Sequence, residues 1–241
     1  MVLLVFQGGG YVMTLARIKY AKGNEIKYIS HLDFQRSFHR LLNRAGIDVA
    51  FSQGFNPHLK VSYAMAMPVG MTSEGEYLDV ELVAPVDAGK LKLLLNEHAP
   101  KGLKIVAVKI FEEPVKSLAS VITEGILKVE VPIEDDVTEN KIREVFEEIL
   151  KKDVLELTRK NKKGKFVTKN IRSYIKKLEL DGVSDNKAHV DMVLSMGSID
   201  NLNPQLLLDY MIREYKIFKE FPKAKIHRVE MLVNGEKIDL K

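Results

Sequence analysis

Three arginines are spaced four residues apart in the N-terminal part of the chain, at Arg36, Arg40 and Arg44. A helix places residues four apart on one side, so these side chains would form a basic stripe flanked by His39. Neighbouring like charges add little to helix stability, whereas the guanidinium fork fits phosphate oxygens. We expect the stripe to contact phosphate groups, with a solvated face or pairing with acids of another element as the alternative.

A second basic segment runs from residue 159 to residue 172 and contains a turn glycine, one aromatic residue and no acid. The residues expected to contact RNA or phosphate there are Arg159, Lys160, Lys162, Lys163, Lys165, Lys169 and Arg172. A run of charged residues is usually a solvated loop. Because this run is long and contains no acid, a contact with RNA or phosphate is about as well favoured as a solvated loop. Phe166 could stack on a base or pack on its own scaffold.

The candidates for general acid–base catalysis are His31, Asp33 and His58, which belong to a helix start and to a loop. The candidate site also includes four residues of the loop that precedes His58, namely Ser52, Gly54, Phe55 and Asn56. The spacing matches no zinc signature, nucleophile elbow or glycine-rich nucleotide motif, so no metal site is predicted. The pattern favours an alternative in which Ser30 and Asp33 cap a helix, while Asn56 and His58 hydrogen-bond the turn of their own loop.

The 241 residues include no cysteine and carry a formal charge of +4. The absence of cysteine excludes disulfides, thiolate metal sites, cysteine-held iron–sulfur clusters and a cysteine nucleophile. No apolar run approaches the ~20 residues that span a bilayer, and residues 1–12 are expected to be a poorly ordered leader or extension. We therefore expect a cytoplasmic protein that holds no cofactor and does not enter a membrane; its oligomeric state is not set by the sequence.

Hydrophobic periodicity predicts the elements that position these residues. In residues 13–113 the expected order is a strand at 14–29, a helix at 31–45, strands at 60–67 and 76–83, a helix at 87–98 and a strand at 102–111. In residues 118–241 it is a strand at 119–133, a helix at 138–151, a short extended segment at 154–158 that leads into a basic loop at 159–169, strands at 171–180 and 188–196, a helix from Asn203 and a strand at 226–233. The order β-α-β-β-α-β thus occurs twice, which predicts an α+β chain of two tandem ferredoxin-like domains with antiparallel sheets and helices on one face.

Residues 27–47, which contain Ser30-His-Leu-Asp33 and the arginines, resemble the opening of the radical-SAM-linked protein family. Residues 51–62 and 67–81 resemble it too, and residues 163–175 do so more loosely, with Ser173 where related chains often have proline. Members of that family are encoded beside, or fused to, radical-SAM proteins that often carry a cobalamin-binding region. The resemblance implies a stand-alone accessory protein with a radical-SAM partner and transfers no catalytic residue. The Ser-His-Leu-Asp and Gly-Phe-Asn-Pro stretches also faintly resemble the repeat-associated RNA-processing proteins, which consist of ferredoxin-like domains.

These observations leave three functions open. The first is a non-catalytic accessory protein that binds tRNA or rRNA and presents it to a radical-SAM enzyme. For this function, the two basic segments are expected to gather their charge onto one surface. The second is an RNA-processing or RNA-modifying enzyme that uses His31, Asp33 or His58, for which these side chains would have to converge in a pocket. The third is a protein–protein adaptor, which would lack the steep salt dependence of phosphate contacts.

Overall fold

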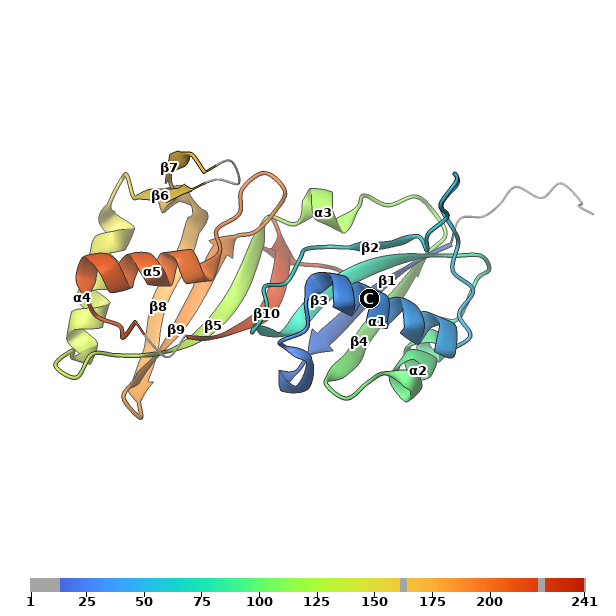
Figure 1. The fold of residues 1–241 in the computed structure, drawn as a ribbon, viewed down its shortest axis with the longest axis horizontal. Helices are drawn as coiled ribbons and strands as arrows, with labels where there is room; N and C mark the ends of the chain where they lie inside the picture. Colours follow the sequence, from blue (N-terminus) through green and yellow to red (C-terminus); the bar gives the residue numbers. More distant parts are fainter. Residues whose placement is uncertain (1–13, 161–163, 221–223, 241) are drawn as a thin grey trace, which may run out of the picture.

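The computed structural model describes residues 14–160, 164–220 and 224–240. The expected leader at 1–12 lies outside the described residues. The chain forms two halves that lie side by side along the long axis of the molecule, the N-terminal half on the right in Figure 1 and the C-terminal half on the left. In the described residues, no helix is both long enough and apolar enough to cross a membrane.

The N-terminal half consists of four strands, two helices and a short 3-10 turn. Its elements are β1 (Thr14–Lys22), η1 (Asn24–Ile26), α1 (His31–Arg44), β2 (Val61–Tyr63), β3 (Thr72–Leu82), α2 (Ala88–His98) and β4 (Leu103–Phe111). The strands pair antiparallel in the order β4-β1-β3-β2. β2 is shorter than the strand expected at 60–67, and the strand expected to resume at 26–29 is replaced by the 3-10 turn.

The C-terminal half follows a short connecting helix, α3 (Leu118–Val121). Its elements are β5 (Glu124–Pro132), α4 (Glu139–Lys151), β6 (Glu156–Lys160), β7 (Phe166–Asn170), η2 (Arg172–Tyr174), β8 (Ile175–Ser184), β9 (Lys187–Ser195), α5 (Pro204–Tyr215), β10 (Lys225–Val233) and β11 (Glu236–Lys237). The strands β10-β5-β9-β8 pair antiparallel in that order. The expected basic loop at 159–169 is instead part of a separate two-stranded hairpin, β6–β7.

A single nine-stranded sheet runs through both halves, which corrects the expectation of two separate sheets. The halves join where β3 and β10 pair in parallel, with Thr72 opposite His227 and Ser73 opposite Arg228. The overall architecture is therefore mixed α+β, with a mostly antiparallel sheet.

Each half buries its own apolar core between the helices and one face of the sheet. In the N-terminal half, Phe34, Phe38 and Leu41 of α1 pack with Ile18 and with residues of α2 and β3. In the C-terminal half, α4 and α5 cover the inward residues of β5, β8 and β9 in the same way. Figure 1 shows α1 and α5 in front of the sheet, so the helices of both halves lie on the same face. We refer to the other face as the open face.

Buried ionic side chains link the two halves on both faces of the sheet. On the helix-covered face, Arg228 Nη1 of β10 donates to Glu76 Oε1 of β3 at 2.6 Å. On the open face, Glu230 of β10 accepts from Tyr77 Oη at 2.7 Å and from Lys19 Nζ at 2.5 Å. An unpaired buried charge is costly, so these pairs favour one relative placement of the halves.

Candidate nucleic-acid interface

The helix α1 begins at a cap formed by its own sequence. The backbone N–H of Asp33 donates to Ser30 Oγ at 3.2 Å, and Ser30 Oγ donates to Asp33 Oδ2 at 2.7 Å. This arrangement satisfies a backbone donor at the first turn, and the negative charge is favourable at a helix N-terminus. The capping interpretation of Ser30 and Asp33 is therefore confirmed.

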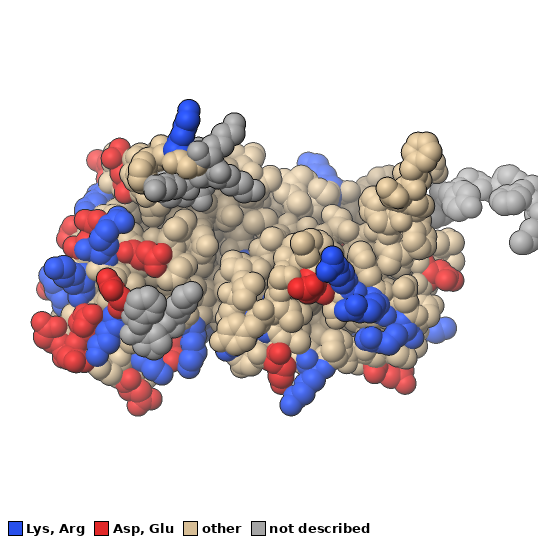
Figure 2. Space-filling model, viewed as in Figure 1, with Lys and Arg blue, Asp and Glu red and all other residues tan. Residues whose placement is uncertain are grey.

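Because the apolar side of α1 faces the core, its arginines face solvent. The guanidinium of Arg36 lies 3.3 Å from Asp33, and both side chains are exposed. Arg44 Nη2 donates to the backbone oxygen of His98 at 3.0 Å. Arg40 is exposed and has no hydrogen-bond or ion-pair partner in the described part of the chain. Figure 2 shows the resulting blue patch over α1, with little red beside it.

The loop of residues 51–58 lies next to α1. Ser52 and His58 close its base: the Ser52 N–H donates to the His58 oxygen at 2.8 Å, and the His58 N–H donates to Ser52 Oγ at 3.1 Å. Ser52 Oγ also lies 2.9 Å from His58 Nδ1. The tip carries Gly54 and a fully exposed Phe55, and Phe51 is exposed as well. Asn56 contributes its backbone oxygen, 3.4 Å from His58 Nδ1, so the loop histidine does hydrogen-bond its own turn.

His39 lies on the flank of α1 that faces this loop. Partial burial lowers the pKa of His39, and the proximity of His58 lowers it further. The imidazole of His39 is thus disposed to stay neutral near pH 7 and contributes hydrogen-bonding capacity rather than charge. The proximity of His39 to His58 relates the exposed side of α1 to the loop, and we call the arginines, His39 and the loop together the α1–loop surface.

The acid–base candidates are not assembled into a catalytic group. His31 Nε2 lies 3.1 Å from Gln35 Nε2, and the His31 ring packs edge-on against Tyr63 at 5.5 Å. Burial, with a smaller effect of Lys22, lowers the pKa of His31. Asp33 is committed to the helix cap and to the neighbouring arginine, while His58 is at the loop base. Within the described ranges, no three His, Asp or Glu side chains are placed to hold a metal ion.

The second basic segment lies on the other half of the molecule. The β6–β7 hairpin and α1 are far apart in Figure 1, so the two basic segments do not form one surface. Lys169 Nζ lies 3.7 Å from Asp200 and 4.5 Å from the ring centroid of Tyr174. Lys165 and Phe166 are exposed and have contacts of their own. Lys162 and Lys163 lie outside the described residues, and Arg159 and Lys160 are described only as backbone of β6.

Arg172 has a structural position. Its Nε and Nη2 donate to the backbone oxygen of Leu150 in the last turn of α4, at 3.1 and 2.5 Å. Its Nη1 donates to the oxygen of Ile175 at 3.0 Å. A cation that binds the free carbonyls at a helix C-terminus stabilises that end, which accounts for an arginine here without a ligand.

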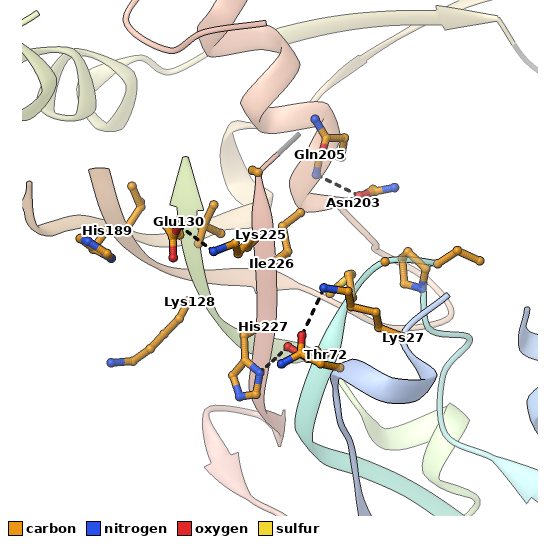
Figure 3. Close-up of a pocket in the computed structure, with 18 of the residues that line it drawn as sticks. Lys27, Thr72, Lys128, Glu130, His189, Asn203, Gln205, Lys225, Ile226 and His227 are labelled. Carbon is orange, nitrogen blue, oxygen red and sulfur yellow. Dashed lines mark hydrogen bonds and ion pairs between the residues drawn. The ribbon is translucent and has the colours of Figure 1, made fainter. Parts of the chain in front are cut away.

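A cleft of about 910 Å³, which no sequence pattern indicated, lies between the two halves. The cleft opens where β10 extends beyond the start of β3, because the two strands pair only from His227 onward. Figure 3 shows Lys27 on one side of it and Lys128, Lys225 and His189 on the other. None of the sequence-predicted site residues lines this cleft.

Two cross-strand rows of side chains line the open-face wall of the cleft. Lys225, Glu130 and His189 form one row, and His227, Lys128 and Asp191 form the other. The sequence signal for them is the alternation of polar and apolar residues in β5, β9 and β10, but only strand pairing places them in rows.

Charges in the cleft are balanced. Hydrogen bonds from Lys187 and Lys225, at 2.7 and 3.0 Å, lower the pKa of Glu130 and keep it ionised. The lining has three lysines and three acids, at Lys27, Lys128, Lys225, Glu130, Asp181 and Asp191. A polyanion is therefore favoured less by the cleft than by the α1–loop surface.

No curated protein matches the sequence. Among solved structures, a chain of a Cbf5–Nop10–Gar1 complex is similar, with 10% identity, a TM-score of 0.48, and coverage of 92% of this chain and 49% of that one. A chain of the archaeal box H/ACA sRNP Nop10–Cbf5 complex has 11% identity, a TM-score of 0.45 and coverage of 88% and 46%. This chain thus spans about half the length of both.

A family match extends over most of the chain. The family DUF2344, described as an uncharacterized protein conserved in bacteria, matches residues 16–204. That range contains the capped start of α1, the arginines, the loop of residues 51–58 and the β6–β7 hairpin. The chain belongs to the DUF2344 family.

Proposed function

We propose that this protein is a non-catalytic accessory protein that binds RNA through the α1–loop surface. The observation that carries the proposal is the exposed stripe of Arg36, Arg40 and Arg44, in which Arg40 has no partner among the described residues. Asp33 is the only acid in α1, so the stripe retains net positive charge. Exposed guanidinium groups bind phosphate oxygens through paired donors, and RNA is the polyanion that a tRNA- or rRNA-directed accessory protein would meet.

The finer architecture supports the same proposal. With the β6–β7 hairpin and β11 left out, each half has the order β-α-β-β-α-β, and the strand orders β4-β1-β3-β2 and β10-β5-β9-β8 are equivalent. We infer two ferredoxin-like domains, at 13–113 and 118–241, joined edge to edge. Proteins of this architecture can bind RNA on the sheet or on flanking elements, and here the basic residues lie on a flanking helix.

The partner enzyme is proposed on sequence grounds alone. Residues 27–47 and 51–62 resemble the radical-SAM-linked family, and a cysteine-free chain cannot hold the iron–sulfur cluster of such an enzyme itself. We therefore propose that a radical-SAM protein supplies the chemistry, while this chain holds the RNA. Copurification of the two proteins, with and without nuclease treatment, tests whether they bind directly.

A filter-binding assay with unfractionated tRNA and with poly(U) tests RNA binding. Replacing Arg36, Arg40 and Arg44 together by alanine should weaken binding by at least about ten-fold, because each phosphate contact contributes to affinity. A charge-matched control replaces Lys141, Lys151 and Lys176, which are exposed on the other half. Equal affinity of the arginine variant and the wild type would exclude the α1–loop surface. Affinity that does not change with salt in the wild type would favour the protein–protein adaptor.

The enzyme alternative is not favoured. It requires His31, Asp33 and His58 to face one substrate, whereas each has a separate structural partner. A second test follows from this geometry. His31→Gln, a change outside the α1–loop surface, should leave any activity of a reconstituted complex unchanged, and a loss of activity with normal RNA binding would favour the enzyme.

A further inference from the structure

Phe55 is held in solvent by a closed loop. Its side chain is fully exposed at the tip, and Phe51, at the base of the same loop, is 60% exposed. Single exposed apolar residues are common on protein surfaces. Phe55 differs in that it lies at the tip of a loop whose two ends are joined by hydrogen bonds.

The loop has a defined shape before any ligand binds. Three contacts between Ser52 and His58 close it, and Phe51 and Leu59 form an isolated bridge below them. Gly54 adopts φ = +124°, which other residues rarely adopt, so the turn requires glycine at this position. A preformed loop loses little conformational entropy when a ligand contacts its tip.

The position of the loop relates Phe55 to the arginines. Leu59, which directly follows the loop, packs against the core cluster that contains Phe38 and Leu42 of α1, so the base of the loop lies close to that helix. In Figure 1 the loop projects above α1 at the upper right. The segment from Phe51 to His58 contains no acid, so nothing in it repels a phosphate backbone.

We propose that the α1–loop surface binds unpaired RNA nucleotides, with a base stacked on Phe55 and phosphates at the arginines of α1. The inference rests on the proposed function and adds the class of RNA. A base inside a duplex is covered by its neighbours, so the ring of Phe55 can stack only on a base that is unpaired or flipped out. Exposed cations on α1 and an exposed ring on the loop whose base lies close to α1 are complementary to a single strand, which presents both phosphates and base faces.

The test compares two RNA probes and three single variants. The probes are a fluorescently labelled uridine oligonucleotide of about twelve residues and a labelled RNA duplex of similar length. The variants are Phe55→Ala, Phe55→Trp and Phe166→Ala. Phe166 is the matched control, because it is also an exposed phenylalanine, next to the second basic segment. Circular dichroism checks that the fold is unchanged, as expected for exposed positions.

The wild type should prefer the single strand. Phe55→Ala should weaken single-strand binding on the order of ten-fold, the usual size of a stacking contribution, and should leave duplex binding unchanged. Phe55→Trp should retain affinity, and Phe166→Ala should behave as the wild type. An oligonucleotide with one 2-aminopurine should lose fluorescence on binding to the wild type and less on binding to Phe55→Ala, because stacking on an aromatic ring quenches it.

Two failures are distinguishable. If neither probe binds the wild type, the proposed RNA function fails together with this inference. If the single strand binds and the triple arginine variant loses it, but Phe55→Ala binds normally, RNA binding stands and the stacking role of Phe55 is excluded. A loss on Phe166→Ala equal to that on Phe55→Ala would also overturn the inference, because it would place the single strand at the β6–β7 hairpin.

Discussion

Glu76 and Arg228 form an ion pair of 2.6 Å between the two halves of the protein, with 1% and 3% of their side chains exposed. The pair is incompletely satisfied: within the described residues, Glu76 Oε2 and Arg228 Nε have no hydrogen-bond partner. A register shift in the β1–β3 pairing, between Tyr20 opposite Glu76 and Lys22 opposite Ser73, accompanies this contact. The seam between the halves is therefore held by charge in a buried environment, where removing one member is costly.

Removing only one member of that pair should destabilise the protein severely. Arg228→Met leaves the Glu76 carboxylate buried without its cation, and we expect the free energy of unfolding to fall by about 3–5 kcal/mol. The double variant Glu76→Leu with Arg228→Met should lose less, because no charge remains buried. Urea unfolding of the three proteins measures this, and a loss below about 1 kcal/mol in the single variant would contradict it.

Gly75 lies at a close approach of the two halves. A Cβ at this position would lie 2.5 Å from the Val229 oxygen and 2.6 Å from the Glu230 Cα. Gly75→Ala should therefore separate the strands and lower the free energy of unfolding by about 1–3 kcal/mol. Gly182→Ala is the control, since nothing lies within 4 Å of its Cβ position. Equal thermal stability of both variants would show that β3 and β10 can move apart without cost.

The stability of the protein should decrease as the pH falls from about 7.5 to about 5.5. Burial lowers the pKa of His31 and of His39 in the folded state. In the unfolded chain these histidines have the ordinary pKa of about 6.5. As the pH falls toward and below this value, the unfolded chain binds more protons than the folded protein, so stability is lost. The variant His31→Gln with His39→Gln should show a shallower dependence in urea unfolding at several pH values. An unchanged slope would mean that neither imidazole is coupled to folding.

Arg172 should contribute to stability and not to RNA binding. Arg172→Ala removes the donors to the Leu150 oxygen at the end of α4, with an expected loss of about 1–2 kcal/mol. Poly(U) affinity should stay the same. Lys176→Ala, an exposed change nearby, is the control for both measurements. A loss of RNA affinity without a loss of stability would reverse the assignment.

Salt dependence counts the phosphate contacts of the α1–loop surface. For poly(U), the slope of log affinity against log salt should become shallower by about 0.7 in Arg40→Ala, the value for one contact to a single strand. The same slope in the wild type and in Arg40→Ala would mean that this guanidinium does not touch phosphate. Lys176→Ala should leave the slope unchanged.

Local features of the N-terminal site followed from the sequence. The cap at Ser30 and Asp33, the apolar side of α1 and the exposed arginines depend on residues three or four apart, so the helix period alone places them. The order of strands and helices was also predicted from periodicity. By contrast, β7 was not recognised as a strand, and β6 was expected only in part, as the extended segment at 154–158. The described side chains of β7 are all exposed, so no apolar alternation indicates a sheet there.

Tertiary structure alone decided which distant residues meet. Glu76 and Arg228 are 152 positions apart, and the rows Lys225–Glu130–His189 and His227–Lys128–Asp191 each join three strands, so only strand order and register bring them together. Tertiary structure also decided where the two basic segments lie. The sequence predicted one shared surface, whereas the fold places the segments on different halves of the molecule. Charge and period are properties of a short stretch of chain, whereas the surface on which that stretch lies depends on pairings between segments far apart in sequence.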